Sequence, residues 1–66
     1  MTDLEAFRWC LGTNATIEFG ARQAGVEGVL VRAAGFEVWR GPRVMISFIE
    51  AVIEIKKRVE AARVAS

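Results

Sequence analysis

Apolar and charged residues alternate most regularly in the last third of the chain. Between residues 48 and 63, apolar side chains recur at intervals of four and three, while Glu50, Glu54, Lys57 and Arg58 take the opposite side. This spacing gathers the apolar side chains into one stripe along a helix. The stripe comprises Phe48, Val52, Ile55, Val59 and Ala62. The pattern therefore predicts a helix over 48–63 that packs its stripe on another layer.

A second, shorter helix is predicted over residues 3–11. Thr2 and Glu5 have the spacing of a capping box, and Gly12 stands where a helix C-cap glycine belongs. The helix has apolar residues on two sides, with Leu4, Phe7 and Leu11 on one side and Trp9 and Cys10 on the other. We expect both sides to be covered.

Between these helices the apolar period changes to two, which predicts strands. The expected strands cover residues 16–22, 29–33 and 36–40. A turn over 24–28 contains two glycines, and Gly35 allows a tight reversal before the third strand. These segments predict consecutive antiparallel hairpins.

Residues 41–47 allow two continuations. Pro42 is favoured in the first turn of a helix, so one long helix could start there. Alternatively, residues 43–46 form a short fourth strand. We favour the strand, because Ser47 and Glu50 form a second capping box that would start the helix at Phe48.

The predicted fold is thus α+β, in one small domain over residues 1–66. A short N-terminal helix precedes a four-stranded antiparallel meander, and the C-terminal helix packs on one face of the sheet to give two layers. The side chains expected beneath the helix are Ile17, Phe19, Val29, Val31, Phe36, Val38, Val44 and Ile46.

The composition favours self-association. The chain has 66 residues, 53% of them apolar, with one cysteine and no histidine. A core this small is marginal, and neither a disulfide nor a zinc site can be built within the chain. We therefore expect a homodimer without a metal or cofactor. Ile49 and Ile53 flank the helical stripe, so we expect them at the subunit interface.

Motifs for catalysis are missing from the sequence. It has no histidine for base catalysis and no Gly-rich phosphate loop, and Glu50 and Glu54 are expected on a solvated helix face. No apolar run is long enough to span a membrane, and the first five residues are acidic where a signal peptide is basic. We expect a cytoplasmic, non-enzymatic protein that does not bind membranes.

Strand alternation sends an unusual set of side chains to the sheet face away from the helix. The predicted contact residues there are Trp39, Arg32, Arg22, Arg43 and Met45. Together with Leu30 they suggest a patch that another protein surface covers, such as the N-terminal helix or a second subunit. We therefore expect a small binding or regulatory module that contacts another protein through this face.

Binding of single-stranded nucleic acid is the alternative function for this face, because Trp stacks on bases and Arg contacts phosphates. The expected order of four strands and a helix is also similar to that of the transcriptional coactivators that bind single-stranded DNA. The net charge of +1 favours a protein partner, since nucleic-acid-binding domains are usually clearly basic.

Overall fold

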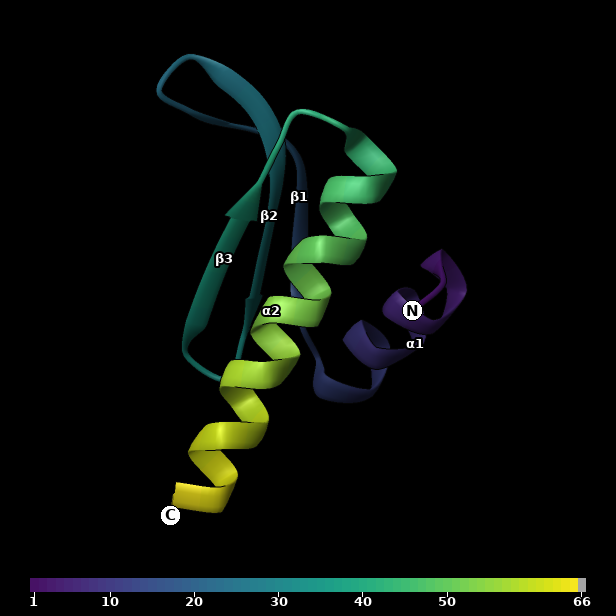
Figure 1. The fold of residues 1–66 in the computed structure, drawn as a ribbon, viewed down its shortest axis with the longest axis vertical. Coiled ribbons are helices and arrows are strands. Elements are labelled where there is room, and N and C mark those ends of the chain that lie inside the picture. The colour runs from purple at the N-terminus through teal and green to yellow at the C-terminus, as the bar shows by residue number, and fades with distance from the viewer. Residues whose placement is uncertain (66) are drawn as a thin grey trace.

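The computed structural model describes residues 1–65, and over these residues it contains two helices and a three-stranded antiparallel sheet (Figure 1). The elements are α1 (Asp3–Thr13), β1 (Thr16–Gln23), β2 (Val26–Ala33), β3 (Phe36–Arg40) and α2 (Val44–Ala65). The α+β class and the helix packed on a sheet are confirmed. The prediction of a fourth strand is wrong.

The capping box predicted for α1 is present. The backbone N–H of Glu5 donates to Thr2 Oγ1 at 3.2 Å, and the Thr2 N–H donates to Glu5 Oε1 at 2.9 Å. The helix runs past its predicted end, because Gly12 keeps a helical conformation and Asn14 forms the C-cap. Asn14 adopts the left-handed conformation with φ 59°, which short polar side chains tolerate.

Both hairpins close through two-residue turns. The pairs Ala24-Gly25 and Ala34-Gly35 all have positive φ, which is the backbone of a type I′ turn. β1 therefore extends to Gln23 and β2 starts already at Val26, where a longer turn had been predicted. The strands follow the order β1-β2-β3, as expected for a meander.

A β-bulge at Gly20 interrupts the alternation of β1. Phe19 pairs with Val29, but the next partners are Ala21 and Gly28, so Gly20 is the extra residue and has φ 83°. An extra residue shifts the side chains that follow it to the opposite face. Ala21 therefore lies on the outer face of the sheet.

Residues 44–46, predicted as a strand, form the first turn of α2. The Ser47 N–H donates to the Arg43 carbonyl oxygen at 2.6 Å, and the Ser47 residue is buried within the helix. Ser47 is therefore not an N-cap. The helix starts at Val44, two residues after Pro42, so one long helix forms as in the alternative prediction, but Pro42 is not its first residue. Val44 and Ile46, expected under the helix, are 57% and 49% exposed because they belong to the helix itself.

The core lies between α2 and one face of the sheet. Phe48, Val52 and Ile55 of α2 are fully buried against Val29 and Val31 of β2. α2 crosses β2 and β3, and α1 lies beside α2 on the side of β1 (Figure 1). The sheet thus has one face covered by helices and an outer face without a second layer.

Candidate interaction surface

Trp39 is the central residue of the predicted contact face. It lies on the outer face of the sheet, where its side chain is hydrogen-bonded within the chain. Its indole N–H donates to the Ala21 carbonyl oxygen at 2.9 Å, and the residue is half-buried. Leu30, its register partner on β2, is only 8% exposed. The Trp39 ring is therefore part of the packing of this face, and only part of its surface is open to a partner.

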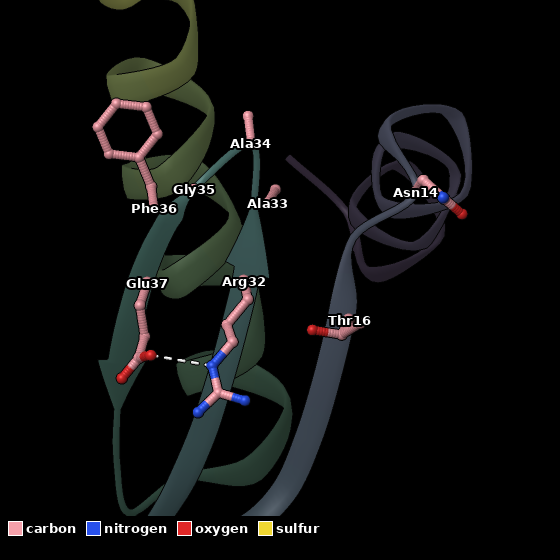
Figure 2. Close-up of a pocket in the computed structure, with 8 residues that line it drawn as sticks. All are labelled: Asn14, Thr16, Arg32, Ala33, Ala34, Gly35, Phe36 and Glu37. Atoms are coloured by element: carbon pink, nitrogen blue, oxygen red, sulfur yellow. Dashed lines mark hydrogen bonds and ion pairs between the residues drawn. The ribbon is translucent and has the colours of Figure 1, made fainter.

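Arg32 is also on the outer face, where it forms an ion pair. Its Nε lies 2.9 Å from Glu37 Oε2, and both side chains are more than half exposed. Figure 2 shows Thr16 on the neighbouring strand with its hydroxyl directed toward Arg32. These residues border a hollow of about 300 Å³ that also contacts Asn14 and the Ala34-Gly35 turn. The hollow is lined by the Arg32–Glu37 ion pair and otherwise by neutral residues.

Arg22 does not belong to the face of Trp39 and Arg32. It follows the bulge at Gly20 and pairs in register with Glu27. Glu27 lies on the same face of β2 as the buried Val29 and Val31, which is the face toward α2. The Arg22 Nη2 lies 3.4 Å from Glu27 Oε1. A lone glycine inside a strand is a recognised sign of a bulge, so this signal was available in the sequence.

The other two predicted contact residues are not on the sheet. Arg43 precedes α2, and Met45 lies in its first turn with 41% of its surface exposed. Their placement on the outer face rested on the fourth strand, which does not exist in the described chain. The five predicted contact residues are therefore divided between three places. The similarity of element order to the single-stranded-DNA-binding coactivators disappears with that strand.

Large apolar side chains are also exposed on α1. The helix turns small residues inward, with Ala6 0% and Cys10 3% exposed, and turns large residues outward. Leu11 is 82% exposed and Leu4 is 54% exposed. Both apolar sides of this helix were expected to be covered, but the side with Leu4 and Leu11 is left open. The helix packs on α2 rather than on the outer face of the sheet.

Phe7 and Phe19 extend this apolar region toward β1. Their rings flank the fully buried Phe48, with centroid distances of 4.5 Å for Phe7 and 5.9 Å for Phe19. Phe7 is nevertheless 37% exposed and Phe19 49% exposed. We refer to Leu4, Phe7, Leu11 and Phe19 together as the α1 surface.

Ile49 and Ile53, predicted at a subunit interface, are both half-buried by the chain itself. Ile49 packs against the core. Their role between subunits stays a prediction, and the residues of the α1 surface are more exposed than either.

Two ionisable groups among residues 1–65 have shifted pKa values. The two hydrogen bonds to Thr2 lower the pKa of Glu5, and burial raises the pKa of the Cys10 thiol. Residues 1–65 contain no group of three side chains that could hold a metal ion. No helix in this part of the chain is long and apolar enough to cross a membrane.

Comparison of the chain with protein-family models, with curated proteins and with solved structures finds no match.

Proposed function

We propose that this protein is a cytoplasmic, non-enzymatic interaction module that binds a protein partner through the α1 surface. The observation that carries the proposal is the orientation of α1, which buries Ala6 and exposes Leu11 and Leu4. A helix with large apolar residues on its outward side is typical of an element with a second packing partner. The proposed contact therefore lies on the helical layer, whereas the sequence predicted it on the outer face of the sheet.

The energetics favour this surface. Burial of one exposed leucine side chain contributes about 1.5–3 kcal/mol, so a few such residues in contact supply most of a specific affinity. Phe7 and Phe19 are already fixed against Phe48, and they lose little side-chain freedom on binding. The surface is therefore largely pre-organised for a partner.

The outer face of the sheet is less suited to single-stranded nucleic acid. Arg22 lies on the opposite face, Arg32 is paired with Glu37, and the Trp39 indole N–H is bonded to the Ala21 carbonyl oxygen. Phosphate contacts need free cations, and base stacking needs an open ring face. We therefore expect no saturable quenching of tryptophan fluorescence by mixed-sequence single-stranded DNA at low salt. Quenching that weakens as salt is raised would favour nucleic-acid binding instead.

Site-specific photocrosslinking tests the proposed surface directly. A photoreactive phenylalanine derivative replaces Leu11 in one variant and Val64 in the other, and both are expressed in the cells that carry the gene. Val64 is a matched control because it is apolar and 89% exposed, but belongs to the far end of α2. We expect a discrete crosslinked protein band from position 11 and none from position 64. Equal or absent crosslinking at both positions would contradict the proposal.

A further inference from the structure

We infer that the α1 surface pairs with the α1 surface of a second copy of the chain, with the two α1 helices antiparallel about a two-fold axis near Phe7. This inference rests on the proposed function and names the partner of the same surface. Three features of the surface point to self-pairing: its symmetry, its area and the charges at its border.

The outward stripe of α1 is nearly symmetric about its centre. Leu4 precedes Phe7 by three residues and Leu11 follows it by four, so one leucine lies about one turn away on each side. In an antiparallel pair, Leu4 of one copy therefore meets Leu11 of the other, and the Phe7 side chains lie near the axis. A two-fold interface requires a patch that is complementary to itself, and this stripe has that property.

The exposed area is also suitable for a dimer. Given about 150–250 Å² for a large side chain, the α1 surface exposes roughly 400 Å² of apolar area. Standard interfaces bury about 800 Å² per partner, of which only the centre is strongly apolar and the rest is a polar rim. The α1 surface has the size expected for the centre of such an interface.

The charges bordering the stripe are complementary across the axis. Arg8 and Glu5 lie on the same side of the stripe, because residues advance by about 100° along a helix. Arg8 has no ion-pair partner within residues 1–65. Corresponding sides of two antiparallel helices face each other, so Arg8 of each copy comes close to Glu5 of the other. The net charge of +1 adds little repulsion between copies.

Sedimentation equilibrium over a wide concentration range tests self-pairing. We expect the wild type to approach twice the chain mass of 7.3 kDa. Leu11→Arg should raise the dimer dissociation constant by roughly a hundredfold or more, because each dimer buries two copies of this leucine. Leu11 is so exposed that its replacement leaves the monomer folded, as circular dichroism should verify, and Val64→Arg is the matched control.

Disulfide trapping tests the antiparallel arrangement. Leu4→Cys and Leu11→Cys chains are mixed and oxidised, while the native Cys10 stays unreactive because it is buried and its pKa is raised. Mixed disulfides between positions 4 and 11 should exceed both homotypic products. Predominant 4–4 and 11–11 disulfides would overturn the antiparallel arrangement.

The two proposals fail in distinguishable ways. A wild type that stays monomeric at all concentrations, or a dimer that Leu11→Arg leaves intact, would overturn self-pairing. If the wild type is monomeric and position 11 crosslinks to a protein of different mass, self-pairing is contradicted. Binding of a separate protein partner through the α1 surface is then supported. If the wild type is monomeric and position 11 yields no crosslink, both proposals fall.

Discussion

The indole ring of Trp39 occupies the space beside Gly28 that a side chain would need. A Cβ at Gly28 would lie 2.6 Å from Cε2 of the ring, and it would also collide with the carbonyl oxygen of Arg40. The same ring donates its N–H to Ala21 on β1. Trp39 therefore connects the end of β3 to both strands of the first hairpin, at the point where the hairpin extends beyond β3.

Gly28→Ala should destabilise the protein because the new methyl group meets an aromatic ring and a backbone carbonyl that cannot both move. We expect the free energy of unfolding to fall by about 1–3 kcal/mol in urea denaturation. Gly12→Ala is the matched control, since a Cβ there meets nothing within 4 Å and the residue lies in α1. It should raise the free energy of unfolding by up to about 1 kcal/mol. Equal effects of the two substitutions would contradict the packing of Trp39.

Ser47→Ala distinguishes a helix that begins at Val44 from one capped by Ser47. Inside α2, alanine should leave the free energy of unfolding unchanged or raise it by up to about 0.5 kcal/mol. Thr2→Ala removes a true N-cap and should lower it by about 1 kcal/mol. A loss at Ser47 as large as the loss at Thr2 in the same urea titration would argue that α2 starts later.

Ala34→Asn should stabilise the second hairpin. Ala34 has φ 51°, a left-handed conformation that alanine adopts at a cost and that asparagine tolerates. Asn-Gly is the preferred pair for a type I′ turn, so we expect the unfolding free energy to rise by about 0.5–1 kcal/mol. Ala61→Asn, an exposed change within α2, should lower it slightly because asparagine is a weaker helix former. Thermal denaturation of both variants measures the difference, and a lowered midpoint for Ala34→Asn would contradict the turn assignment.

The Glu5 carboxylate should stabilise the fold only while it is charged. Its folded pKa lies below the ordinary value of 4.5, so its contribution is fully present above pH 4.5 and is lost as pH falls through the folded pKa. Glu5→Gln keeps a group that can accept from the Thr2 N–H but does not titrate. The stability difference between wild type and Glu5→Gln, measured by urea denaturation across pH, should therefore shrink below pH 4.5. A difference that stays constant would show that the carboxylate charge does not contribute.

The local patterns predicted most of the fold, and they were wrong where two local signals competed. The Thr2 and Ser47 capping boxes look alike in sequence. Only Thr2 stands at the start of a helix, where backbone N–H groups have no partner within the helix and need a cap. The Ser47 N–H is already bonded to Arg43, because the apolar residues 44–46 continue the helix instead of forming a strand. Whether such a segment pairs with a sheet edge or extends a helix depends on tertiary packing.

The contact surface could be predicted less well than the fold. The sequence shows two apolar sides on α1, but not which of them α2 would cover. Ala6 and Cys10 are small enough to allow close approach, so the side with less apolar volume faces inward and Leu11 faces outward. Hydrophobic periodicity alone favours the opposite orientation. Likewise, strict alternation misplaced Arg22, because it ignored the extra residue at Gly20.

The contact between Phe7 and Phe48 also has a consequence for the order of folding. Each hairpin closes through a two-residue turn, whereas this contact spans about forty residues, and distant contacts form more slowly than local ones. We therefore expect the sheet and α2 to assemble before α1 docks. During synthesis α1 leaves the ribosome before α2, so it can dock only after α2 has emerged. The surface proposed to join two copies is thus completed last, so pairing is confined to chains that have finished folding.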